Sequence, residues 1–294
     1  MIDYDPHRWM DHFFDLKGSM VREIVGRLLI FTVWAAAVVA LHLYVVPVGV
    51  PSTVHSLVGV ALGLLLVFRT NSSYDRFWEG RKLWGGIVNE TRNLGRAAGV
   101  FLRERDPELY RTLVNWTAVF PYAAASVLRG ERDLGPVAAQ LPAEEVRQVG
   151  AAQHLALAVS LRISEALAEG RRRGHYNEYT QLALDQNVQQ LIDYLGGCER
   201  IHKTPMPFAY MVHLRRALVI YCASLPFALV ESFGWAAVLD TFLVSYVFFG
   251  IEEIGVEIED PFGTDDNDLP LERICSVIQA NLQGLLPGES PRPG

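Results

Sequence analysis

The 294-residue chain has few cysteines and no excess of basic residues. Cys198, Cys222 and Cys275 lie far apart and are odd in number, which favours neither a disulfide framework nor a zinc site. Lys and Arg number 26 against 33 Asp and Glu, so the formal net charge is −7. A nucleic-acid-binding protein needs a basic surface to neutralise phosphates, so we expect no nucleic-acid partner.

The sequence also lacks the motifs of common enzymes. It contains no glycine-rich phosphate loop, no His-Glu-x-x-His and no nucleophile elbow. The eight histidines are scattered, and none pairs with another at metal-ligand spacing on one helix face. We therefore expect neither an enzyme nor a required cofactor. The first residues, MIDYDPHRWMDHFFDLKG, have no basic start followed by an apolar core, so they do not form a secretory signal.

Charged residues are absent from a long apolar stretch, residues 28–68. A membrane-spanning helix needs about 20 apolar residues, so this stretch is long enough for two. The segment VPVGVPST, residues 46–53, has the prolines and glycine of a turn and separates spans over about 27–46 and 54–68. The second span is short, and no helix breaker follows Phe68. We therefore expect this helix to continue past the membrane boundary.

A second apolar region, residues 217–251, is interrupted only by Glu231 and Asp240. The segment ESFGW, residues 231–235, is typical of a turn between a third and a fourth span. Asp240 then lies either inside the fourth span, turned toward protein or water, or at the membrane interface. The sequence is compatible with both positions.

Basic residues flank these spans unevenly. They precede the first span, follow the second and precede the third, whereas the two short connections contain no Lys or Arg. By the positive-inside rule, both termini and the middle of the chain are cytoplasmic. The pattern predicts a multi-pass membrane protein in contact with lipid.

The middle of the chain, residues 69–210, is predicted to be a soluble helical domain, because apolar positions recur there at helical spacing. Helices are expected over 104–130 and 141–174, the second with a break near Gly150, and over 177–197, ending at its closing glycine pair. The expected segments are a cytoplasmic N-terminus (1–26), transmembrane helices 1 and 2 (27–68), the cytosolic domain (69–210), transmembrane helices 3 and 4 (211–255), and an acidic loop with a cytoplasmic tail (256–294).

Two adjacent faces of the second span have a regular composition. Val60, Leu64 and Phe68 recur every four residues and share one face of a helix. Gly59 and Gly63 share the next face, where small residues let a neighbouring helix approach closely. From spacing alone, packing inside a helix bundle is the favoured interpretation of both faces.

Three segments resemble the signatures of one family, the bestrophins, in its bacterial branch. They are VFRTNSSYDRFWEGRKLWG, LGGCERIHKTPMPFAY and EIEDPFGTDDNDLPLERIC, starting at residues 67, 195 and 257. Arg76 and Trp78 match an Arg-x-Trp element of the family, with Phe77 in place of the more usual Trp. The segments occur in the family's order, and the resemblance covers nearly the whole chain. Together the three segments are a specific signature of the family, whereas any one of them alone would be weak evidence.

The resemblance implies an all-α fold in which four transmembrane helices per subunit are continuous with a cytosolic helical bundle. It also implies a homopentamer around one central pore in a bacterial inner membrane. The family's three neck positions fall on Val60, Leu64 and Phe68, which five copies would turn into apolar rings able to gate by dewetting. A second constriction, at the cytoplasmic exit, maps to Tyr179 or another residue of NEYTQLAL.

The acidic segment near residue 260 corresponds to a loop that binds calcium in animal bestrophins, with help from backbone carbonyls near the N-terminus. By position, the ligands carried over are Asp260, Asp265 and Asp268. Thr264 and Asn267 stand where the animal pattern has acidic residues, so calcium is an option here rather than a requirement. The alternative is an Asp-rich helix start, with Asp268 as a cap and a proline in the first turn.

The resemblance implies a channel for monovalent ions, and two features favour cations. Val60 and Leu64 are aliphatic and lack the partly positive edge with which an aromatic ring favours an anion. The chain is acidic overall, and a negative vestibule concentrates cations. Chloride or another anion is the alternative ion. A membrane scaffold that conducts nothing and binds a partner through its cytosolic bundle is the alternative function.

Overall fold

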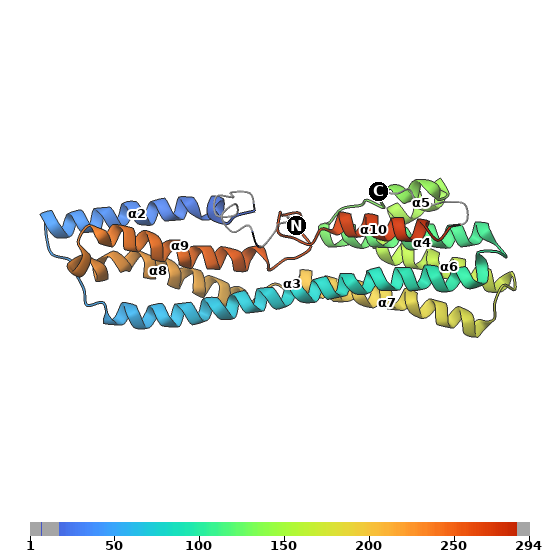
Figure 1. Ribbon diagram of the computed structural model, residues 1–294, viewed down its shortest axis with the longest axis horizontal. Coiled ribbons are helices and arrows are strands. Elements are labelled where there is room, and N and C mark those ends of the chain that lie inside the picture. Colours follow the sequence, from blue (N-terminus) through green and yellow to red (C-terminus); the bar gives the residue numbers. More distant parts are fainter. Residues whose placement is uncertain (1–6, 8–17, 287–294) are drawn as a thin grey trace. The chain divides into compact units, whose positions relative to one another are not determined.

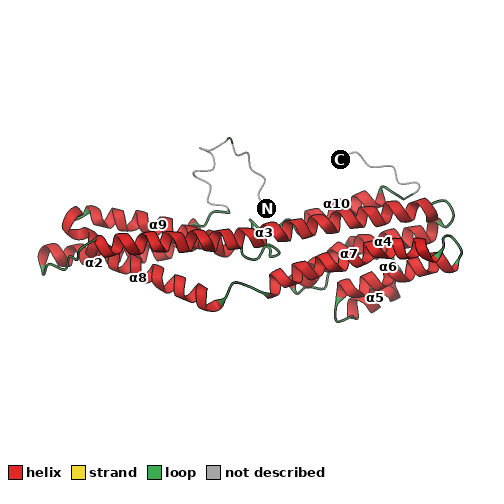
Figure 2. Cartoon of the chain, turned by 90° about the horizontal axis from the view of Figure 1, so that it is seen from below, coloured by secondary structure: helices red, strands yellow, loops and turns green. Residues whose placement is uncertain are grey.

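In a computed structural model, residue 7 and residues 18–286 are described, and every regular element within them is helical (Figures 1 and 2). The all-α expectation is therefore confirmed. The secretory-signal assessment of the first residues and the end of the predicted tail lie outside the described part. The elements are α2 (Val21–Tyr44), α3 (Thr53–Leu102), α4 (Pro107–Arg129), η1 (Pro136–Gln140), α5 (Ala143–Ala151), α6 (Leu155–Arg172), α7 (Glu178–Lys203), α8 (Phe208–Phe233), α9 (Ala236–Glu257) and α10 (Leu271–Gln283).

The described residues fall into two compact units. The first unit comprises the chain up to residue 77 with residues 205–260 and 265–268. The second unit comprises residues 78–204, 261–264 and those from 269 onward. Helix α3 contributes its first half to one unit and its second half to the other.

The first unit is a bundle of α2, α8, α9 and the first half of α3. Helix α2 packs against both α8 and α9, which also pack against each other. The rings of Phe31 and Phe249 stack at 5.4 Å between centroids and join α2 to α9. The buried core also contains Ile24, Leu28, Leu62, Leu66, Leu214, Leu218 and Cys222.

Three of the four expected membrane spans are long and apolar enough to cross a bilayer within the described residues: α2, α3 and α8. Helix α9 forms as expected but does not meet this criterion. It carries Asp240 near its start and Glu252 and Glu253 near its end, so no stretch of spanning length has two charges or fewer. The fourth span therefore stays a prediction, although its helix is present.

Helix α3 confirms that the second apolar segment continues as helix. It runs for 50 residues from Thr53 to Leu102 without a break. At 1.5 Å per residue, a helix of about 20 residues already crosses the hydrocarbon core, so α3 is long enough to continue well beyond it.

The second unit is a bundle of α4, α6, α7, α10 and the second half of α3, with the short η1 and α5. Helix α4 packs against α6 and α10, and α6 against α7. The Asp106 side chain caps α4 by accepting the Leu109 N–H at 3.1 Å, and Gly130 ends it with a φ of 69°. Both ends lie close to the expected ones, and the expected break near Gly150 separates α5 from α6.

The prediction that a helix stops at Gly196–Gly197 is wrong. Helix α7 continues through both glycines to Lys203 and ends just before Pro205. The glycine at 197 serves close packing instead, because an added Cβ would lie 2.8 Å from a methyl carbon of Leu83 on α3.

Helix α3 carries a second glycine pair, Gly85–Gly86, and one of its two members also permits close packing. An added Cβ at Gly86 would lie 2.6 Å from the ring of Tyr194 on α7. At the preceding residue, Gly85, the nearest atom would be an Arg81 nitrogen at 3.7 Å, which is an ordinary contact. One glycine of the pair is therefore required by packing and the other is not.

We expect Gly86→Ala to lower the free energy of unfolding by about 1–3 kcal/mol, because the new methyl group overpacks the Tyr194 ring. The matched control Gly85→Ala should be neutral or more stable by up to about 1 kcal/mol, since alanine is the better helix former. Thermal unfolding of the purified variants measures both. Equal melting temperatures for the two variants would contradict this use of Gly86.

Candidate functional site

The first half of α3 presents a stripe of apolar side chains that its own chain leaves uncovered. Leu57, Val60, Leu64 and Phe68 are between 56% and 69% exposed. They recur every three or four residues, so they lie along one face of the helix. We call these four residues the apolar stripe. The three predicted neck residues all belong to it.

The opposite face of α3 holds the helix in the first unit. Leu62 and Leu66 are buried in the core, and the Tyr210 hydroxyl donates a hydrogen bond to the Leu65 carbonyl at 2.9 Å. Gly59 lies against the Tyr221 side chain of α8, whereas an added Cβ at Gly63 would meet nothing within 4 Å. One of the two predicted small-residue contacts is thus made within the chain, and the other position is open.

Among the described helices that are long and apolar enough to cross a membrane, α3 is the least covered. Only 17% of the residues in its most apolar stretch are buried, against 33% in α2 and in α8. A contiguous exposed apolar surface marks a contact with lipid, with another protein copy or with a water-poor passage.

A buried charge fixes the rotation of α3 directly after the stripe. The side chain of Arg69 is fully buried, and its Nη2 lies 3.5 Å from a carboxylate oxygen of Glu259. The other Glu259 oxygen accepts the Met206 N–H at 2.9 Å. Gly255 of α9 leaves room for the guanidinium, since an added Cβ there would lie 3.1 Å from Nε. Arg69 is turned into the protein, whereas its neighbour Phe68 is 64% exposed.

A second set of ion pairs joins α2, α8 and α9 at one end of the first unit. The buried carboxylate of Glu252 accepts a hydrogen bond from Nε of Arg215 at 2.9 Å. Nη1 of Arg27 lies 2.8 Å from Glu253 and 3.6 Å from Glu252. These pairs explain how α9 carries two adjacent glutamates without leaving a buried charge unpaired.

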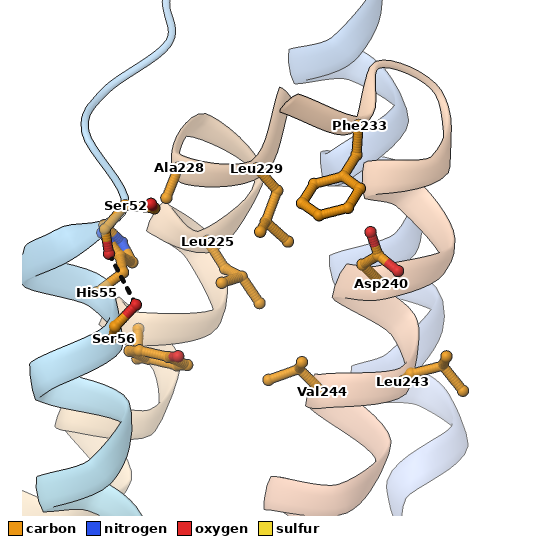
Figure 3. A pocket seen from close by; sticks show the side chains of 11 residues that line it. Ser52, His55, Ser56, Leu225, Ala228, Leu229, Phe233, Asp240, Leu243 and Val244 are labelled. Atoms are coloured by element: carbon orange, nitrogen blue, oxygen red, sulfur yellow. Dashed lines mark hydrogen bonds between the residues drawn. The ribbon is translucent and has the colours of Figure 1, made fainter. Parts of the chain in front are cut away.

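At the other end of the first unit, a cavity of about 400 Å³ opens between α3, α8 and α9 (Figure 3). Ser52 and His55 line one side, and Asp240 and Phe233 line the other. The His55 ring nitrogen lies 2.8 Å from the hydroxyl of Ser224. Asp240 therefore lines a cavity within the protein, as expected for a carboxylate turned toward protein or water. It also lies near the start of α9, as expected for a residue at the membrane interface.

The predicted cytoplasmic constriction lies in the second unit. Tyr179 is 75% exposed in the first turn of α7, which Asn177 caps by accepting the Thr180 N–H at 3.0 Å. Leu182 is exposed one turn later on the same face. Both side chains are therefore available for contact with water or another copy, and the assignment of Tyr179 stays a prediction.

The acidic loop does not gather the three predicted calcium ligands into a metal-binding group. Asp260 and Asp265 are exposed, whereas Asp268 is buried and accepts the Asp265 N–H at 2.7 Å. Burial, followed by the nearby carboxylates, raises the pKa of Asp268 to about 6. Within the described residues, no three His, Cys, Asp or Glu side chains are placed to hold a metal. As placed, these residues do not fit calcium, which wants about 6–8 oxygen ligands.

The contacts of two residues in the first unit, Arg69 and Asn267, were not predicted from the sequence. Arg69 is the first charged residue after the apolar stretch, and this position is the signal that could have singled it out. Asn267 donates hydrogen bonds to the Gly18 carbonyl at 3.1 Å and to a Glu257 oxygen at 2.8 Å. No sequence pattern indicates the contact with Gly18, because the two residues are 249 positions apart along the chain.

Comparison with known proteins gives consistent matches. The family described as "Bacterial/Fungal Bestrophin protein" matches residues 1–284. A voltage-dependent anion channel-forming protein of Nostoc sp. is 40% identical over 94% of this chain and 91% of its own length. The voltage-dependent anion channel-forming protein YneE of Escherichia coli is 33% identical over 96% and 93%. A crystal structure of a bacterial bestrophin homologue from Klebsiella pneumoniae is similar with a TM-score of 0.85 and 30% identity, over 91% of this chain and all of that one.

We expect Arg69→Met to lower the free energy of unfolding by about 3 kcal/mol, because Glu259 loses its cationic partner. The double variant Arg69→Met, Glu259→Gln should lose less than the sum of the two single variants. Thermal unfolding in detergent measures the losses, with Arg22→Met, on the exposed face of α2, as the control. Additive losses in the double variant would show that the two side chains are not coupled.

Proposed function

Because the chain belongs to the bacterial and fungal bestrophin family, we propose that it forms a homopentameric channel for monovalent ions whose pore is lined by the apolar stripe. Its apolar helices and bacterial relatives make it a bacterial membrane protein, and its relatives are named as channel-forming proteins. The single observation that carries the proposal is the exposure of Val60, Leu64 and Phe68 on the face of α3 that its own chain leaves open.

Five-fold symmetry would give the stripe a function that one copy cannot have. A closed ring of subunits places the same residue of each copy around one axis. Each stripe residue then forms an apolar ring, which offers an ion nothing in exchange for its hydration water. Such a ring conducts ions when water fills it and closes when the water leaves it.

In the proposed orientation, both termini and the second unit lie in the cytoplasm of a bacterium with the first unit in its inner membrane. The basic residues around the apolar helices support this orientation. Tyr179, exposed at the start of α7, is the proposed constriction at the cytoplasmic exit.

Anions are the first candidate for the permeant ion, because the curated relatives are named as anion channel-forming. Phe68 agrees with this candidate, since the partly positive edge of an aromatic ring attracts an anion.

Cations are the second candidate, and the chain's own composition favours them. The rest of the stripe, Leu57, Val60 and Leu64, is aliphatic and has no such edge. The net charge of −7 per chain, repeated five times, attracts cations to the pore entrances.

Reversal potentials in planar bilayers separate these candidates. Under a tenfold KCl gradient, the anion candidate predicts a reversal near the chloride equilibrium potential, about 59 mV from zero. The cation candidate predicts the same magnitude with the opposite sign. If correctly folded, reconstituted protein passes no current, both are excluded and the non-conducting scaffold is favoured.

Shortening the stripe tests whether it lines the pore. We expect Leu64→Ala and Phe68→Ala to raise the conductance, because a wider ring dries less readily. A barrier lower by about 1.4 kcal/mol corresponds to a tenfold rise. Ile220→Ala, on an exposed position of α8, is the matched control and should leave the current unchanged. Unchanged currents in all three variants would remove the stripe from the pore.

A further inference from the structure

The Asn267 side chain joins three separate parts of the first unit. Its amide nitrogen lies 3.1 Å from the backbone carbonyl of Gly18, which precedes α2. The same nitrogen lies 2.8 Å from Oε1 of Glu257, the last residue of α9. Asn267 itself belongs to the acidic loop. One NH₂ group thus connects the start of the described bundle, the end of its last helix and the loop that follows.

The chemistry of the two partners fixes the orientation of this amide. A backbone carbonyl and an ionised carboxylate are acceptors only, so the group between them must be a donor. The NH₂ of an asparagine has two hydrogens, one for each oxygen. The carbonyl oxygen of Asn267 is therefore turned away from both partners.

The surroundings of the amide are rich in oxygen and in negative charge. Asp260 and Asp265, together with Glu257, raise the energy of the ionised Asp268 carboxylate. A backbone carbonyl next to carboxylates is the kind of oxygen set that binds a hard divalent cation in proteins. The observed contacts of 2.8 and 3.1 Å are hydrogen-bond distances.

We propose that the Asn267 amide takes the place of a divalent cation between Gly18 and Glu257, so that this chain closes its acidic loop without a bound metal ion. The amide supplies two N–H donors where an ion would supply positive charge. This proposal concerns the stability of the loop and does not depend on whether the protein conducts ions.

Asn267→Asp is the variant that tests the substitution directly. Aspartate has the same shape, but its oxygen would face the Gly18 carbonyl and the Glu257 carboxylate. Two carboxylates and a carbonyl then converge without a donor, which destabilises the loop unless a cation enters.

Thermal unfolding in detergent, with EGTA, with millimolar CaCl₂ or with millimolar MgCl₂, gives the readout. The unaltered protein should melt at the same temperature in all three conditions. Asn267→Asp should melt lower in EGTA by about 2–8 °C, and calcium should restore part of the loss. Isothermal titration calorimetry should detect calcium binding to Asn267→Asp and not to the unaltered protein.

Exchanging the two functional groups provides a matched rescue. In the double variant Glu257→Gln, Asn267→Asp, the amide and the carboxylate change places, so a donor again faces an acceptor. We expect this variant to regain part of its melting temperature in EGTA, since the Gly18 carbonyl still lacks its donor, and to lose the response to calcium. Asn267→Ala, which has neither donor nor carboxylate, should melt lower and respond to no ion.

Three results would overturn the proposal. The first is a rise in the melting temperature of the unaltered protein with calcium. The second is an Asn267→Asp variant that melts lower but does not respond to calcium or magnesium. The third is a double variant no more stable in EGTA than Asn267→Asp. If Asn267→Asp does not fold, the response of the unaltered protein and the rescue by the double variant still decide.

Discussion

The packing of α3 within the first unit leaves one apolar face of this helix without cover, and the proposed function follows from that constraint. Leu62 and Leu66 bury one face in the core, while the apolar stripe remains exposed. Such a surface cannot face bulk water at no cost, since each buried apolar side chain gains about 1.5–3 kcal/mol over an exposed one. Lipid, other copies of the chain or a water-poor pore must therefore cover it, and in a ring of identical subunits each can cover a part.

Buried polar contacts, rather than the side chains of the stripe itself, determine which way the stripe faces. Arg69 enters the core beside Glu259, and the Tyr210 hydroxyl binds the Leu65 carbonyl. Both contacts lie on the buried side of α3 and leave the helix little freedom to rotate. A charged group just past an apolar segment thus serves to orient it, and not only to end it.

Much of the fold could be predicted from the sequence, because helical periodicity and the absence of charge are local signals. The apolar helices, the break near Gly150 and the continuity of α3 follow from such signals. Spacing alone placed the predicted neck residues on one face but favoured packing inside a bundle, whereas the structure leaves this face exposed.

What could not be predicted depends on contacts between distant residues. A glycine pair is a good stop signal by itself, yet α7 continues because Gly197 packs against Leu83. The ion pairs that accommodate Glu252 and Glu253 join three helices, so the sequence of α9 alone does not reveal them. The role of Asn267 is likewise visible only when Gly18 and Glu257 are seen beside it.

Gly255 shows that a residue on another helix contributes to the orientation of the stripe. It lies on α9, and the absence of a side chain there leaves room for the close approach of the buried Arg69 side chain. A methyl group there would lie 3.1 Å from Nε of Arg69, so the guanidinium would have to shift by a few tenths of an ångström. In the proposed channel, substitutions at Gly255 should therefore alter permeation from a helix other than the one that carries the apolar stripe.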